Sequence, residues 1–332
     1  MKRRSGSWLV SLGVAAIVAL AGATGLVVAT NSQLSAVRRD ASATDSLSPS
    51  NDAFENYLFV GSDSRQGSDP SDPDYDNVGA EGDVGGKRSD TLMVMHYVKK
   101  TGGLSLLSIP RDLWVEIGNG SKSQRINTAY QIGTDVLIRT VQKALSIPIH
   151  HYIEIDFQGF KGLVEAVGGV TICVDYPSRD RHTGLFIKAG CPRLDGVEAL
   201  AFARSRFFES KIDGEWTIDG TSDLGRTSRQ RAFVTALLKS SVNHVADNPF
   251  TAGDVFAGAV RAVLVDESLN LLNFARKMRP AVSGSIASFP LAVYGDTVEG
   301  NSVLRLSSDS KEVLQFFAGL GPRPQAEDEA TG

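Results

Sequence analysis

Five charged residues flank three short apolar segments in the first third of the chain: Asp63, Arg65, Arg88, Asp90 and Arg111. Carboxylates together with phosphate oxygens are the ligands that Mg²⁺ prefers. Arginine binds phosphate through a planar fork of N–H donors. If these side chains meet, they can therefore hold a magnesium ion beside a phosphorylated substrate. The alternative is a solvated strand edge with surface ion pairs, which contribute little to stability.

The apolar segments predict three strands that run up, down and up again, at Tyr57–Val60, Leu92–Val98 and Leu104–Ile109. Residues 66–87 are rich in Gly and Asp and have no helical period, so a crossover helix between the first two strands is not expected. Residues 99–103 end in the two glycines of a tight hairpin turn. This meander brings the ends that carry the five charged residues to one edge of a sheet.

The chain then alternates between helical and extended patterns. Helices are predicted at Thr134–Leu145 and Phe157–Val167, and strands at Tyr152–Ile155 and Val170–Val174. This order predicts an α/β fold with three layers, α/β/α, around a mixed central sheet.

A second group of polar residues follows a helix predicted at Leu194–Ala203, and it contains Arg204, Arg206, Arg226, Arg229 and Gln230. The last three stand at the start of another predicted helix, where the spacing places Arg226 on one face with Arg229 or Gln230. Backbone N–H groups at a helix start favour an anion. The cluster therefore predicts an anion site, unless it is a solvated face that forms salt bridges with the acidic insert at 207–222.

The N-terminus predicts an exported protein. Trp8–Thr30 has no charged residue, and about 20 such residues span a bilayer as a helix. Lys2, Arg3 and Arg4 precede it, which places residues 1–7 in the cytoplasm. A cleaved signal peptide is the alternative, and it would also export the rest of the chain. The expected location is the cell membrane, crossed once, with the catalytic domain outside the cytoplasm.

The expected domain organisation is a transmembrane anchor at 8–30, a polar linker at 31–52, one folded domain at 53–321 and a disordered tail at 322–332. The net charge of −4 provides no basic excess for nucleic acid. Motifs of serine hydrolases, zinc proteases and P-loop enzymes are absent from the sequence.

Cys173 and Cys191 are the only cysteines. They do not form a CxxC pair and have no neighbouring histidines, which argues against a metal site. In an exported protein the pair favours a disulfide, although two free buried thiols remain the alternative. The histidines, at His96 and His150-His151 for example, fit core or surface roles better than catalysis.

Taken together, the motifs resemble those of the LytR-CpsA-Psr family. In chain order they are VGSDSR, KRSDTLMVM, LSIPRD, INTAY, GGVTICV, LDGVEALAFARSR and DLGRTSRQR, within about residues 57–240. Family members are membrane-anchored phosphotransferases that move a glycopolymer from a polyprenyl-pyrophosphate carrier to peptidoglycan. The resemblance implies Mg²⁺ at Asp63 and Asp90 and pyrophosphate at Arg65, Arg88 and Arg111.

By the same match, Arg204, Arg206, Arg226, Arg229 and Gln230 would line the other side of the site, and the polyprenyl tail would enter an apolar cleft. The sequence departs from the family pattern in two places. The loop between Arg65 and Arg88 is long and acidic, and the insert after Arg206 is longer than the link that the family usually has. Two other functions remain open: a binding module for lipid-linked anionic glycan without catalysis, and a polyprenyl-pyrophosphate phosphatase.

Overall fold

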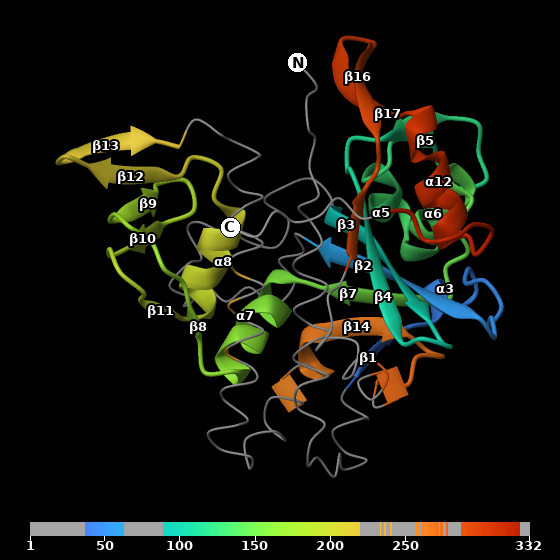
Figure 1. Ribbon diagram of the computed structural model, residues 1–332, viewed down its shortest axis with the longest axis horizontal. Coiled ribbons are helices and arrows are strands. Elements are labelled where there is room, and N and C mark those ends of the chain that lie inside the picture. Colours follow the sequence, from blue (N-terminus) through green and yellow to red (C-terminus); the bar gives the residue numbers. More distant parts are fainter. Residues whose placement is uncertain are drawn as a thin grey trace.

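The computed structural model describes residues 37–62, 89–219, 260–271 and 287–325, with isolated residues between 233 and 277 (Figure 1). The predicted anchor at Trp8–Thr30 lies outside these residues, as does the tail after residue 325. Within the described ranges, no helix combines the length and the apolar character needed to cross a membrane.

A mixed sheet of seven strands forms the centre of the fold (Figure 1). The pairs β1–β14, β7–β2 and β4–β15 are parallel, whereas β14–β7, β2–β3 and β3–β4 are antiparallel. In spatial order the strands are β1 (Arg38–Asp40), β14 (Val263–Asp266), β7 (His151–Ile155), β2 (Phe54–Ser62), β3 (Ser89–Val98), β4 (Gly103–Ile109) and β15 (Ala287–Pro290).

The meander predicted from the sequence is confirmed. Strand β3 pairs antiparallel with both β2 and β4, and the turn between β3 and β4 contains Gly102 at φ +69°. Ser62 is the Cα partner of Ser89, and Leu92 is the partner of Ile109. The end of β2, the start of β3 and the end of β4 therefore meet at one edge of the sheet, which we call the charged edge.

Helices cover both faces of the sheet, because its strands send alternate side chains into two cores. Tyr57 and Phe59 pack with α7 (Phe157–Ala166) and α8 (Gly196–Arg204). Leu58 and Val60 lie in the second core, which is completed by α5 (Thr128–Ile132), α6 (Thr134–Leu145) and α12 (Lys311–Phe317). Strands covered on both faces read as continuous apolar runs, which is the pattern that the sequence contains.

The structure differs from the predicted linker at its C-terminal part. Arg38–Asp40 form the edge strand β1, paired in parallel with β14, and α3 follows at Ala41–Thr44. Asp40 caps this helix by accepting from the backbone N–H of Ser42 at 2.9 Å. The polar sequence hid the strand because an edge strand is held mainly by backbone hydrogen bonds and leaves its side chains in solvent.

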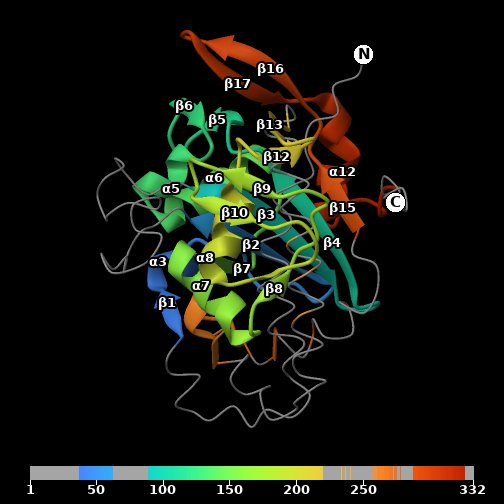
Figure 2. The same ribbon diagram turned by 90° about the vertical axis from the view of Figure 1, so that its left-hand side faces the viewer.

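A second, four-stranded sheet lies beside α8, in the order β10-β9-β12-β13 (Figure 2). We call it the small sheet, and its strands are β9 (Ser178–Asp180), β10 (Leu185–Ile187), β12 (Glu209–Ile212) and β13 (Glu215–Ile218). The insert after Arg206 thus supplies a hairpin. Three other pairs complete the fold: β5 (Trp114–Glu116) with β6 (Ser123–Arg125), β8 (Val170–Thr171) with β11 (Arg193–Leu194), and β16 (Val293–Val298) with β17 (Asn301–Leu306).

The predicted disulfide between Cys173 and Cys191 is present. Beside it, Val174 and Gly190 exchange backbone hydrogen bonds of 2.8 and 2.9 Å. Strand β8 ends at Thr171, which is earlier than the predicted strand Val170–Val174. The disulfide and the isolated bridge between Val174 and Gly190 therefore join the two ends of this loop together.

Candidate active site

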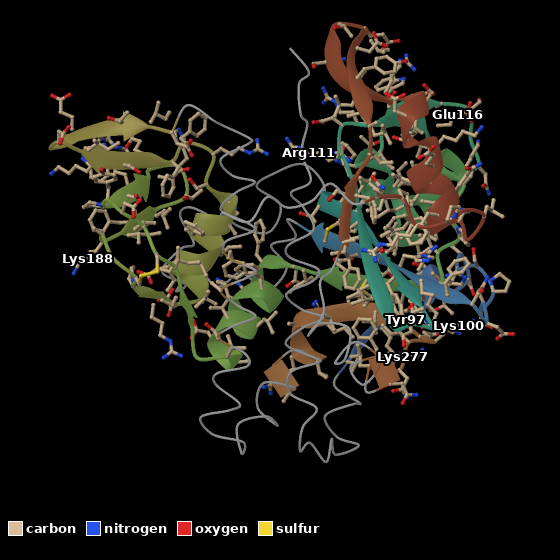
Figure 3. The ribbon with its side chains drawn as sticks, in the orientation of Figure 1. Tyr97, Lys100, Arg111, Glu116, Lys188 and Lys277 are labelled. Atoms are coloured by element: carbon tan, nitrogen blue, oxygen red, sulfur yellow. A yellow bond between two sulfur atoms is a disulfide. The ribbon has the colours of Figure 1, made fainter. Side chains whose placement is uncertain are left out.

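The charged edge brings together the segments that carry the first predicted cluster. Asp90 belongs to β3, while Arg111 follows the end of β4 by two residues (Figure 3). Asp63, Arg65 and Arg88, as well as the Asp90 side chain, lie outside the described residues. The roles predicted for these four residues therefore stay predictions.

A β-bulge lies at the backbone of Asp90. Gly61 is paired with Thr91 and Ser62 with Ser89, so the register shifts and Asp90 is the extra residue. A Cβ on Gly61 would lie 2.9 Å from Thr91 Cβ, so a glycine is needed for this close approach. Bulges often redirect a side chain next to an active site.

Arg111 lies in a turn that begins at Pro110. Proline has no N–H to donate to a strand partner, and its carbonyl accepts from Leu113 N at 3.1 Å to close the turn. The Arg111 side chain is about one quarter exposed, and its Nε lies 3.6 Å from Asp112 Oδ2. The turn therefore presents a partly exposed guanidinium at the charged edge.

The INTAY segment at 126–130 packs directly on this turn. Asn127 N donates to Arg111 O at 3.3 Å, and Arg125 Nε lies 3.5 Å from Asp112 Oδ1. Two buried atoms at this edge, Asn127 Oδ1 and Ser89 Oγ, have no hydrogen-bond partner within the described part of the chain. Such atoms are costly to leave unpaired.

Tyr130 connects the same segment to the end of β2. Its hydroxyl lies 2.8 Å from Ser62 Oγ and 2.6 Å from Glu154 Oε1, and Tyr152 donates to Glu154 Oε2 at 2.6 Å. A phenol has one hydrogen, so Tyr130 can donate to Glu154 while it accepts from Ser62. Burial, followed by the charge of Glu154, raises the pKa of Tyr130, which keeps the phenol protonated.

Arg204 and Arg206, from the second predicted cluster, lie at the end of α8. The Arg204 guanidinium is 4.7 Å above the centroid of the Phe157 ring, a cation–π contact with the first residue of α7. Arg226, Arg229 and Gln230 fall outside the described residues.

Asp180 of the small sheet fixes the backbone around Arg206. Its Oδ2 accepts from Ser205 Oγ at 2.7 Å, from Arg206 N at 3.0 Å and from Phe207 N at 2.9 Å. Burial alone would raise the pKa of this fully buried carboxyl group, but the hydrogen bonds from Ser205 and the backbone outweigh burial and lower it. The ionised carboxylate therefore holds the turn that carries Arg206.

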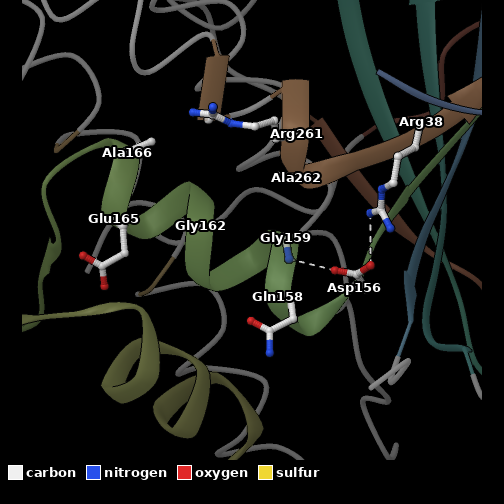
Figure 4. A pocket seen from close by; sticks show the side chains of 10 residues that line it. Arg38, Asp156, Gln158, Gly159, Gly162, Glu165, Ala166, Arg261 and Ala262 are labelled. Atoms are coloured by element: carbon white, nitrogen blue, oxygen red, sulfur yellow. Dashed lines mark hydrogen bonds and ion pairs between the residues drawn. The ribbon is translucent and has the colours of Figure 1, made fainter. Parts of the chain in front are cut away.

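An open pocket of about 760 Å³ lies between α7 and residues 258–262 (Figure 4). Asp156, which follows β7, forms an ion pair of 3.0 Å with Arg38 on one of its walls. Gly159 lies so close to this segment that a Cβ would be 2.1 Å from Ala262 O. The pocket is lined by small and charged residues, so it does not match the apolar cleft expected for a polyprenyl tail.

Two of the histidines for which the sequence favours a core or surface role lie in the core. His96 and His150 are 3% and 5% exposed, and both contact the Phe54 ring. Among the described residues, no group of three or more His, Cys, Asp or Glu side chains could hold a metal ion.

Sequence reasoning missed three residues of this region: Glu154, Tyr130 and Asp180. Tyr130 lies within the INTAY motif, but only the fold places it against Ser62 and Glu154. Glu154 belongs to a strand that reads as apolar, and Asp180 lies in a loop-like stretch without periodicity. A carboxylate inside a buried strand is the one signal that could have identified Glu154.

The chain is similar to proteins of cell-wall assembly. It is 37% identical over 263 residues to the probable cell wall biosynthesis protein LcpB of Corynebacterium glutamicum, with 78% of this chain and 60% of that protein covered. It is 37% identical over 179 residues to the polyisoprenyl-teichoic acid–peptidoglycan teichoic acid transferase TagU of Bacillus mycoides. That match covers 53% of this chain and 54% of TagU, so the chain spans little more than half the length of these relatives.

A solved LytR-Csp2A-Psr enzyme from Actinomyces oris shares the fold, with a TM-score of 0.59. It is 23% identical and the match covers 80% of this chain and 89% of the other. Residues 24–316 match the LytR_cpsA_psr family. Since this match includes the sheet, both core layers and the small sheet, the chain belongs to the LytR_cpsA_psr family.

Proposed function

We propose that the protein transfers a glycopolymer from a polyprenyl-pyrophosphate carrier to a hydroxyl group of peptidoglycan. The main observation that supports this proposal is the charged edge, where a β-bulge at Asp90 lies beside the end of β2 and near the turn of Arg111. The family supports this reaction, and the relative TagU is named for a transfer of the same class.

In the proposed reaction, the acceptor hydroxyl oxygen attacks the phosphorus that is bonded to the sugar. A new P–O bond forms a phosphodiester, and the bond to the bridging oxygen of the pyrophosphate breaks. The electron pair leaves with polyprenyl phosphate, and the hydroxyl proton goes to a base. Asp63 is our first candidate for this base, because it directly follows Ser62 at the charged edge, although binding of a metal ion would lower its basicity.

Positioning and charge neutralisation are the main requirements of phosphoryl transfer. Arg111 would bind the pyrophosphate oxygens together with Arg65 and Arg88. Arg204 and Arg206 would contact the donor from the other side, with Arg226, Arg229 and Gln230. Asn127 Oδ1 and Ser89 Oγ, which have no partner among the described residues, support a polar ligand at this edge, because a ligand with donors can satisfy them.

Asp63 and Asp90 would hold Mg²⁺ at the same edge. Two carboxylates suit Mg²⁺ as ligands. The backbone also brings Asp63 and Asp90 close, since the residues that precede them, Ser62 and Ser89, are cross-strand partners. When bound, the ion neutralises charge that develops on the phosphate oxygens.

We also propose that Trp8–Thr30 anchors the chain in the cell membrane and that the domain lies outside the cytoplasm. The polyprenyl carrier is itself a membrane lipid, so an anchored domain meets its donor there. A reporter fused after Gly321 should be active only if it is a type that works outside. Activity of a cytoplasmic reporter at that position contradicts this topology.

A transfer assay with the full chain tests the function. Its components are a polyprenyl-pyrophosphate oligosaccharide, peptidoglycan fragments and magnesium. We expect a glycan joined to peptidoglycan through a phosphodiester, and the release of polyprenyl phosphate. Free glycan phosphate that forms without an acceptor would identify a phosphatase. Donor binding without any product would identify a binding module. Two carboxylates argue against such a module, because negative charge at an anion site does not help it to bind an anion.

A further inference from the structure

One face of the small sheet combines apolar and basic side chains in a single row. Residues that are direct partners across strands share a face. The register pairs Phe186 with Arg179, Arg179 with Glu209, and Glu209 with Ile218. The contact of Arg179 Nε with Glu209 Oε2, at 2.5 Å, confirms that these two side chains lie on the same side. We call this side the outer face.

The next row of the outer face contains Lys211 and its partner Trp216. The Arg179 guanidinium lies 3.9 Å from the centre of the Trp216 ring, which joins the two rows. Lys188, two residues after Phe186, continues the face beyond β10 (Figure 3). The opposite face turns inward at β10, because Leu185 and Ile187 lie in the core.

The apolar residues of the outer face are open to solvent. Phe186 is 54% exposed and Ile218 is 55% exposed. Both belong to the eight large apolar residues that are exposed in the described chain, and a third, Ile212, lies on the opposite face of the same sheet.

The charge of this face is opposite to that of the chain as a whole. On the strands of this face, Arg179, Lys188 and Lys211 outnumber Glu209, which is already paired with Arg179, and Asp213 lies in the turn between β12 and β13. Glu215 pairs with Ile212 and so lies on the other side of the sheet. The partner of the outer face should therefore be anionic and should also accept apolar side chains.

We propose that the outer face docks on an anionic lipid bilayer. Phe186 and Ile218 would enter the interface, while Lys188 and Lys211 would reach the phosphate headgroups. A sugar chain is a poorer fit, because the Arg179 guanidinium already covers a face of the Trp216 ring. A second copy of the chain is also a poorer fit, since its basic face would repel this one.

Docking of the outer face would serve the proposed transfer reaction, and its role rests on that proposed function. Asp180 lies in the same small sheet and holds the turn of Ser205 and Arg206. A docked sheet would therefore keep Arg206 close to the bilayer, where a polyprenyl-linked donor resides. Lipid docking can be measured without donor or acceptor, so its failure is distinct from failure of the transfer reaction.

The three tryptophans provide a direct test. The full chain with Trp8→Phe and Trp114→Phe retains only Trp216, on the outer face. The matched control retains only Trp114, in β5, which lies at the far side of the molecule from the small sheet (Figure 1). Both proteins are reconstituted in vesicles of brominated phosphatidylglycerol or brominated phosphatidylcholine, since bromine quenches a nearby tryptophan.

We expect quenching of Trp216 that exceeds that of Trp114 and that is stronger in phosphatidylglycerol than in phosphatidylcholine. Added salt should reduce it. Replacing Lys188 and Lys211 by Gln should lower the docked-to-undocked ratio about fivefold for each lysine. Equal quenching of both tryptophans overturns the proposal, and so does equal quenching in both lipids. A Trp216 signal that responds to protein concentration or to soluble phosphorylated glycan, but not to lipid, also overturns it.

Discussion

The carboxylate of Asp180 accepts a hydrogen bond of 3.0 Å from the backbone N–H of Arg206. Asp180 reaches this N–H from the small sheet, while Arg206 follows the last helical residue of α8 by two positions. Because the same carboxylate also accepts from Ser205 and Phe207, it fixes three consecutive residues at the predicted anion site. Asp180 is therefore a positioning residue for Arg206.

Replacing Asp180 by Asn should weaken donor binding and lower stability. Asn keeps one acceptor oxygen but loses the charge, so we expect the free energy of unfolding to fall by about 1–3 kcal/mol. The apparent donor affinity should fall with it. Ser205→Ala, which removes a single donor, is the matched control with smaller effects. Donor affinity that is unchanged in a destabilised Asp180→Asn protein would limit Asp180 to a structural role.

The disulfide should stabilise the region around the small sheet. Cys191→Ser is expected to lower the free energy of unfolding by about 3 kcal/mol, because the bond between Cys173 and Cys191 closes a loop in the unfolded chain. Denaturant unfolding of the variant and of reduced wild-type protein should agree. Mass spectrometry that finds two free thiols in exported, unreduced protein would contradict this prediction.

Acid should destabilise the protein through two buried histidines. Burial lowers the pKa of His96 and of His150 from 6.5 to about 4 in the folded protein. In addition, His150 Nδ1 accepts from the Asn56 N–H at 2.9 Å, and protonation would break this bond. Because the unfolded histidines take up protons first, stability falls as the pH drops from about 6.5 toward 4.

At pH 5 the expected loss is about 2 kcal/mol for each of these histidines. Urea unfolding at pH 7.5 and pH 5 measures this difference in the free energy of unfolding. His96→Gln should reduce the pH dependence, and so should His150→Gln, which removes the other buried histidine. An equal pH dependence in all three proteins would rule out the buried histidines as its source.

Tyr130 should matter for both stability and transfer, because it joins Ser62 to Glu154. Tyr130→Phe leaves both groups without this partner, at a cost of about 1–3 kcal/mol in stability. Since Ser62 precedes Asp63, transfer should fall as well. Tyr152→Phe is the matched control, as it removes one hydrogen bond to Glu154 and leaves the Ser62 contact intact. Similar transfer by both variants would contradict a role for the Ser62 contact.

The fold was predictable where hydrophobic pattern alone decides it. Helix α6 has the bounds that its periodicity predicts, Thr134–Leu145, because one apolar face packs against the sheet. The meander of β2, β3 and β4 was predictable from two loops and their glycines. Strand β1 was not, since three polar residues gain their structure from backbone bonds to β14, which is distant in the sequence.

The candidate site was predictable only in part, for a similar reason. Arg111 could be assigned to the charged edge because Pro110 ends its strand at a point that topology defines. The contacts of Asp180 with Arg206 and of Tyr130 with Glu154 depend on tertiary packing between separate elements. No local pattern encodes such contacts.

The magnesium-dependent transfer rate of Asp90→Asn, in the full chain, is the most direct test of the proposed active site. Asn has nearly the same size but lacks the charge, so we expect a folded protein whose transfer rate is lower by ~10³-fold or more. Donor binding should change less than in Arg111→Ala, because Arg111 is assigned to the pyrophosphate. A near-normal magnesium-dependent rate in Asp90→Asn would contradict the mechanism and reduce the carboxylates to partners in surface ion pairs.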